Sequence, residues 1–116
     1  MAAYDFNDRV FVGTVNYDSG DLTAETRFHY RQKGNAVWGT CEGGGVLFGT
    51  LLAKMEDDGR LTLCWQYVST DGRLVGGTCT SVPEILPDGR YRLHESWQVT
   101  LGGSESGTSV VEELRK

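Results

Sequence analysis

The fold is decided most clearly by residues 91–101, which read Tyr91-Arg92-Leu93-His94-Glu95-Ser96-Trp97-Gln98-Val99-Thr100-Leu101. Every second residue from Tyr91 to Leu101 is apolar with the single exception of Glu95, and the residues between them are polar. Alternation with this period is typical of a β-strand whose two faces meet different surroundings. Residues 60–70 alternate in the same way and place on one face Leu61, Leu63, Trp65 and Tyr67.

Turn-forming residues divide the rest of the chain into similar segments. Asp-Gly pairs occur at 58–59, 71–72 and 88–89, and such pairs favour tight hairpins because these turns need positive φ. Further turns are expected at 17–21, 33–35, 43–45 and 102–107. The strands expected between the turns are Val10–Tyr17, Thr23–Gln32, Ala36–Glu42, Val46–Met55, Arg60–Thr70, Arg73–Val82, Arg90–Leu101 and Thr108–Lys116.

These eight hairpin-linked strands predict an all-β fold, a single eight-stranded antiparallel up-and-down β-barrel. The last segment contains helix formers, but we favour a strand there because an eighth strand lets the sheet close. An open meander would leave two edges of unpaired backbone groups, and a barrel removes both. The chain of 116 residues suits one domain. We expect this domain to span residues 1–116, with the barrel at about 10–115 and a lead-in at 1–9.

Charge and apolar patterning argue against two classes of partner. The net charge is -5, and binding to phosphate backbones needs a concentrated basic surface. The most basic stretch, Arg27–Arg31, is split by alternation between two faces. The longest apolar run, at 46–53, is interrupted and too short to span a membrane. Residues 1–5 lack the features of a signal peptide, so we expect a cytoplasmic protein that binds neither nucleic acid nor membrane.

No metal or cofactor site is expected. The cysteines Cys41, Cys64 and Cys79 form no Cys-x-x-Cys pair, and we interpret all three as small core hydrophobes. His29 and His94 fall on faces that carry arginines, where both would be solvated. The sequence also offers no serine with an adjacent histidine base and no phosphate-binding Gly-x-x-x-x-Gly-Lys loop.

Glu95 is the most informative residue, because it lies between Leu93 and Trp97 on the face expected inside. A buried carboxylate must be protonated, paired or hydrogen-bonded, since burying the bare charge is costly. Glu95 could be the polar anchor of an aromatic ligand pocket. Alternatively it could be tied to a neighbouring hydroxyl, or to an arginine at a barrel end.

The rest of the expected interior is aromatic. Aromatic rings with polar tips suit small-molecule sites, although they also fill barrels that bind nothing. The orientation of Trp38 stays open, because Trp38 with Thr40 and Val37 with Gly39 and Cys41 are alternative inner sets. The candidate ligand-binding residues are Glu95, Trp97, Trp65, Tyr67, Phe28, Tyr30 and Trp38.

Two stretches resemble a family of short bacterial proteins that is often labelled N-acetylglutamate synthase: Phe28–Trp38 and Pro83–Trp97. The resemblance extends over about Val10 to Leu114. It implies a fold similar to the avidin and lipocalin barrels, the calycin group. The label implies an acetyltransferase, but the usual acetyl-coenzyme A fold needs helices that the sequence does not predict. Neither a biotin site nor a lipocalin Gly-x-Trp start is present, so the resemblance identifies no ligand.

Three functions therefore remain open. The first is a binding module that holds a small apolar or aromatic molecule, with Glu95 as its polar contact. The second is an enzyme in which Glu95 acts as general acid or base and Tyr67 or Tyr30 as second proton donor. The third is a filled barrel that works through its surface or by self-association. For such association, Val68 and whichever of Leu47 and Phe48 faces outward would form an apolar patch suited to a homodimer.

Overall fold

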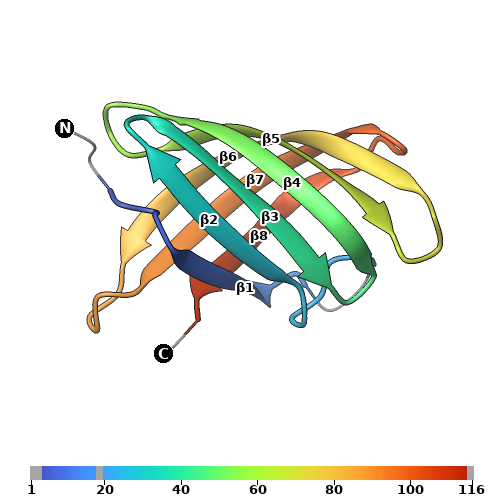
Figure 1. Cartoon of the computed structure of the whole chain (residues 1–116), viewed down its shortest axis with the longest axis horizontal. Helices are drawn as coiled ribbons and strands as arrows, with labels where there is room; N and C mark the ends of the chain where they lie inside the picture. Colours follow the sequence, from blue (N-terminus) through green and yellow to red (C-terminus); the bar gives the residue numbers. More distant parts are fainter. Residues whose placement is uncertain (1–3, 18–19, 115–116) are drawn as a thin grey trace.

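Residues 4–17 and 20–114 are described by a computed structural model, in which the chain forms a closed antiparallel barrel (Figure 1). The strands are β1 (Arg9–Val15), β2 (Arg27–Lys33), β3 (Ala36–Gly43), β4 (Val46–Met55), β5 (Leu61–Ser69), β6 (Leu74–Ile85), β7 (Tyr91–Leu101) and β8 (Ser106–Glu113). Each strand pairs with the next in sequence, and β8 returns to pair with β1. The predicted fold class is confirmed, including a strand rather than a helix at the end of the chain.

Several predicted boundaries were wrong by a few residues. β2 begins at Arg27 rather than Thr23, because residues 23–26 form a turn in which the Thr26 amide donates to the Thr23 carbonyl. β6 continues to Ile85, beyond the predicted end at Val82. Residues 1–3 of the lead-in, Asp18 and Ser19 of the first predicted turn, and residues 115–116 of the predicted last strand lie outside the described residues. No helix in the described part is long and apolar enough to cross a membrane.

One end of the barrel is filled by side chains. The lead-in crosses this end and buries Phe6 completely, 5.5 Å from the ring of Tyr91. Phe11 is also fully buried, and the centre of its ring lies 4.9 Å from the centre of the Tyr30 ring. The Arg9 guanidinium lies 3.8 Å from the centre of the Tyr91 ring and forms an ion pair of 2.7 Å with Glu113. This packed end is at the left in Figure 1, where β1 begins.

The outer wall carries Trp38, whose orientation was open, and Cys64, which was expected in the core. Trp38 is 41% exposed, and Val37, Gly39 and Cys41 are the buried residues of β3. The strand pleat can send only one of the two alternating sets inward, so Trp38, whose orientation the sequence left open, faces outward and does not join the other candidate ligand-binding residues inside. Cys64 is exposed, whereas Cys41 and Cys79 are buried. The expectation that all three cysteines are core residues was therefore wrong for Cys64.

A ladder irregularity and a strand end account for three further exposed residues. The register shifts between Val46 and Phe48, and both Leu47 and Phe48 are exposed near outward Val68. All three residues thus belong to the apolar patch, and the pairing of two chains through it stays a prediction. Leu101 is also exposed instead of facing inward, because β7 ends there and Gly102 turns the chain with a φ of +81°.

Two leucines test this assignment of inside and outside. Leu93 is fully buried, whereas Leu52 on the outer wall is 59% exposed. Leu93→Ala should lower the free energy of unfolding by about 2–5 kcal/mol because it leaves a cavity in packed surroundings. Leu52→Ala should change it by no more than about 0.5 kcal/mol. Urea unfolding followed by circular dichroism measures both, and similar losses in the two variants would contradict the assignment.

Candidate functional site

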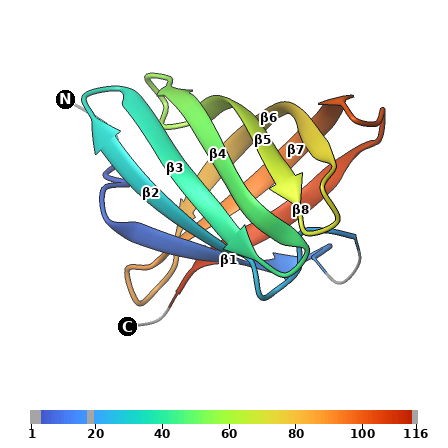
Figure 2. The same cartoon turned by 45° about the vertical axis from the view of Figure 1, so that its right-hand side comes forward.

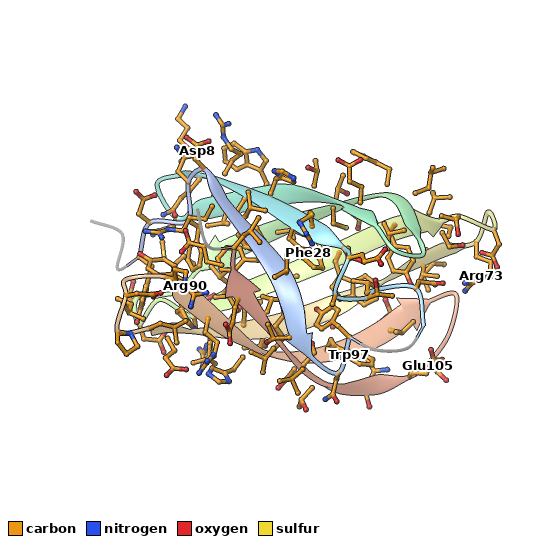
Figure 3. The ribbon with its side chains drawn as sticks, turned by 90° about the horizontal axis from the view of Figure 1, so that it is seen from below. Asp8, Phe28, Arg73, Arg90, Trp97 and Glu105 are labelled. Atoms are coloured by element: carbon orange, nitrogen blue, oxygen red, sulfur yellow. The ribbon has the colours of Figure 1, made fainter. Side chains whose placement is uncertain are left out.

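The other half of the barrel is hollow. It contains a cavity of about 380 Å³, a size within the range of small-molecule sites. The cavity extends from the middle of the barrel to the end that carries Arg73 and Glu105 (Figure 3). Figure 2 brings this end forward, with the hairpins β3–β4, β5–β6 and β7–β8 around it. The aromatic residues that line the cavity are Tyr17, Phe28, Tyr30, Trp65, Tyr67 and Trp97.

Glu95 lies in this cavity and is held by hydroxyl groups from three directions. Tyr17 Oη and Ser109 Oγ donate to Glu95 Oε1 at 2.9 Å and 3.1 Å. Ser81 Oγ donates to the other oxygen, Oε2, at 3.5 Å. Ser81 and Ser109 are the register partners of Glu95 on the two neighbouring strands, β6 and β8. The strand register therefore places both serines beside the carboxylate.

Burial dominates the electrostatics of Glu95. It raises the pKa of Glu95 above the ordinary value of 4.5, although the hydrogen bonds from Tyr17, Ser109 and Ser81 act in the opposite direction. The ion pairs of the described residues include none to Glu95. The accessible part of this side chain faces the cavity rather than bulk water. The site is thus a carboxylate with hydroxyl donors and no cationic partner.

The other titratable groups near Glu95 keep their protons at neutral pH. Burial, followed by the charge of Glu95, raises the pKa of Tyr17 and of Tyr30 well above 10. The same two causes raise the pKa of Cys79 to about 12. These groups can act as hydrogen-bond donors, but they are difficult to ionise. Among these groups Glu95 is consequently the acidic one, and burial raises its pKa above 4.5.

Two indole rings pack closely against glycines of neighbouring strands. Trp65 is the register partner of Gly77, and a Cβ at Gly77 would lie 2.8 Å from the Trp65 ring. Trp97 is likewise the register partner of Gly107, and a Cβ at Gly107 would lie 2.9 Å from the Trp97 ring. Only glycine leaves room for the rings in these positions. Trp65 also stacks on Tyr67, with ring centres 6.0 Å apart and planes inclined by 12°.

Asp21, which lies between β1 and β2, forms hydrogen bonds with residues of two hairpins at the open end of the cavity. Tyr67 Oη donates to Asp21 Oδ2 at 2.8 Å, and Arg73 donates to both oxygens of the same carboxylate at 2.8 Å and 2.9 Å. The Gly45 amide donates to the Asp21 carbonyl at 2.7 Å. The loop is thereby linked to the hairpins β3–β4 and β5–β6. Because Tyr17 lies on the same loop, these contacts also help to position a donor to Glu95.

Six of the seven predicted ligand-binding residues meet in the cavity: Glu95, Trp97, Trp65, Tyr67, Phe28 and Tyr30. Trp38 does not. Sequence reasoning missed Tyr17, Asp21, Ser81 and Ser109. The two serines could have been found from the register of the hairpins around Glu95. Across residues 4–17 and 20–114, no group of three or more His, Cys, Asp or Glu is placed to hold a metal ion.

The closed sheet and its cavity define a class of protein, the up-and-down β-barrels that are packed at one end and hollow at the other. A family model described as avidin-like protein matches residues 4–114, and the chain belongs to this avidin-like family. The resemblance to avidin-type barrels is confirmed, whereas the match does not bear on the N-acetylglutamate synthase label. A search of curated proteins and a search of solved structures each returned no match.

The raised pKa of Glu95 predicts a dependence of stability on pH. As the pH rises above 4.5, the unfolded chain loses this proton before the folded barrel does. The folded state then binds more protons, so the contribution of Glu95 to stability falls until the pH exceeds its folded pKa. The stability of Glu95→Gln does not fall in this way, because the glutamine side chain does not titrate. The free energy of unfolding of the variant minus that of the wild type should therefore increase from acid to neutral pH, as measured by urea unfolding.

Glu84→Gln is the control for this titration. Glu84 is on the outer wall, and its hydrogen bond with His94 is the main cause that lowers its pKa. The free energy of unfolding of Glu84→Gln minus that of the wild type should decrease as the pH rises. The reason is that the contribution of Glu84 to the stability of the wild type is present at neutral pH and lost in acid. Equal trends in the two variants would show that Glu95 is not the buried group described here.

The hydroxyl of Tyr17 should tune the pKa of Glu95. Tyr17→Phe removes a donor that stabilises the carboxylate, so the pKa of Glu95 should rise further. Tyr67→Phe is the matched control because the Tyr67 hydroxyl bonds Asp21 instead. Carbon-13 NMR of the glutamate side-chain carboxyl groups measures the pKa in each protein. An unchanged pKa in Tyr17→Phe, or equal shifts in both variants, would contradict the assigned hydrogen bond.

Proposed function

We propose that this chain is a small-molecule-binding protein that holds a mostly apolar or aromatic ligand in the hollow half of its barrel, with Glu95 as polar anchor. The observation that carries the proposal is the cavity of about 380 Å³ with Glu95 and six aromatic side chains in its lining. A site of mostly apolar walls with a few convergent polar groups is the usual design for a small organic ligand.

Membership of the avidin-like family supports the same function, because it suggests a small-molecule-binding barrel. The position of the cavity adds to this support. Its floor is formed in the middle of the barrel, and its mouth is lined by Arg73, whose side chain is 53% exposed. A ligand can therefore enter from the end opposite the packed one.

The protonation of the site favours binding over proton transfer. In an enzyme that uses Glu95 as general acid or base, a nearby tyrosine would serve as second proton donor. Tyr67 donates to Asp21, and the pKa values of Tyr17 and Tyr30 are raised well above 10 by burial and by Glu95. Phenols of this kind suit fixed hydrogen bonds. Such phenols are poorly suited to act as acid–base catalysts, because they do not readily lose a proton at neutral pH.

Native mass spectrometry of protein purified from its own host tests the proposal. A small molecule should remain bound to the wild-type barrel. Val99→Phe should lose it, because Val99 is buried in the cavity lining and the larger ring occupies ligand space. Thr100→Phe is the matched control, since the same ring is added at the next residue, on the exposed face of β7. It should keep the molecule.

Circular dichroism establishes that both variants fold. A folded Val99→Phe barrel that retains the same molecule would exclude the cavity as its site. If the wild-type protein carries no molecule, quenching of its tryptophans in a metabolite screen provides a second measurement. An absence of any saturable quencher there would count against a binding function.

A further inference from the structure

Glu95 has unused hydrogen-bonding capacity that faces the cavity. An ionised carboxylate offers about four acceptor positions. Oε1 accepts two hydrogen bonds, from Tyr17 and Ser109, whereas Oε2 has only the long contact of 3.5 Å with Ser81. Oε2 can therefore accept at least one more hydrogen bond, and the open space beside this side chain is the cavity.

The charges around the cavity are mostly negative. No lysine or arginine among the described residues forms an ion pair with Glu95, and the carboxylates of Asp21 and Glu105 belong to the lining nearer the mouth. Arg73 is the basic residue of the lining, and its guanidinium is bound by Asp21 and Asp71. An anionic ligand would meet repulsion from this arrangement, and a cationic one attraction.

The walls next to Glu95 are also suited to a cation. Trp65 and Tyr67 form a stacked pair, and Trp97 lies two residues from Glu95 on the same face of β7. The faces of such rings attract cations, and they pack well against flat apolar groups. A carboxylate and the indole rings of the lining would hold the charged and the apolar part of one molecule.

We propose that the ligand is a compact organic amine, bound in its protonated form. Its N–H groups would donate to Glu95 Oε2, and its flat apolar part would lie against Trp65 and Trp97. This inference rests on the proposed binding function and specifies the chemical class of the ligand. A neutral ligand could fill the same space, but it would leave the buried charge of Glu95 without a counter-charge, which is costly in apolar surroundings.

A pH dependence of binding follows from the groups that face Glu95. These are the titratable Tyr17, Tyr30 and Cys79, together with the hydroxyls of Ser81 and Ser109. These three titratable groups stay protonated at neutral and acid pH, so among the described groups that face Glu95 its own carboxylate is the one that changes charge on acidification. Affinity for an amine should fall on acidification as Glu95 gains a proton, and affinity for a neutral analogue should not.

Three probes of similar size and shape test the class of ligand: phenethylamine, phenethyl alcohol and hydrocinnamate, which are cationic, neutral and anionic at neutral pH. Isothermal titration calorimetry should show that the amine binds at least about tenfold more tightly than the other two, which corresponds to about 1.4 kcal/mol. In Glu95→Gln this preference should disappear, while the affinity for the alcohol changes little. Glu84→Gln, which removes an exposed carboxylate of the outer wall, should keep the preference.

Each outcome of this titration decides the inference. An alcohol or hydrocinnamate that binds as tightly as the amine, a preference that survives in Glu95→Gln, or failure of all three probes to bind would overturn it. The proposed function is judged separately. If the alcohol binds and Val99→Phe abolishes that binding, the cavity is a ligand site although the ligand is not an amine. If no probe binds, protein from its own host carries no molecule and the metabolite screen finds no saturable quencher, both proposals fail.

Discussion

Four residue pairs join β1 to β8, from Phe11 opposite Glu113 to Val15 opposite Val110. This pairing closes the sheet, removes both free edges and makes an enclosed interior. It also assembles the site. Ser109 is on β8, opposite Glu95 of β7, and Tyr17 follows β1 on the other side of β8. A sheet left open between β1 and β8 would separate Tyr17 from the carboxylate and expose Glu95 to water.

The interior is divided between stability and binding. At one end the lead-in and the residues around Phe6, Phe11 and Leu93 fill the barrel, so burial of apolar surface stabilises the fold there. At the other end the glycines Gly77 and Gly107 leave room for indole rings that line a cavity. The hollow half leaves space unfilled by side chains and carries a buried carboxylate. The packed half must offset the cost of that arrangement.

Much of this architecture could be predicted from the sequence, because alternation and turn chemistry are local signals. The alternation of residues 60–70 and 91–101, together with seven turn signals, predicted the eight strands to within a few residues, the closed barrel and the inward position of Glu95. The partners of Glu95 depend instead on pairings between strands and on the path of the β1–β2 loop, so Tyr17 and Asp21 were missed. The orientation of Trp38 stayed open because both alternating sets of β3 contain apolar residues, and only tertiary packing decides which set is buried.

A crystal structure of the protein purified from its own host tests the central claim most directly. The account predicts that residue 95 points into an enclosed cavity with its carboxylate within hydrogen-bonding distance of Tyr17 and Ser109. It also predicts electron density for a non-protein molecule beside Oε2. A carboxylate of residue 95 directed into bulk solvent, or an interior filled by side chains at both ends, would contradict the account.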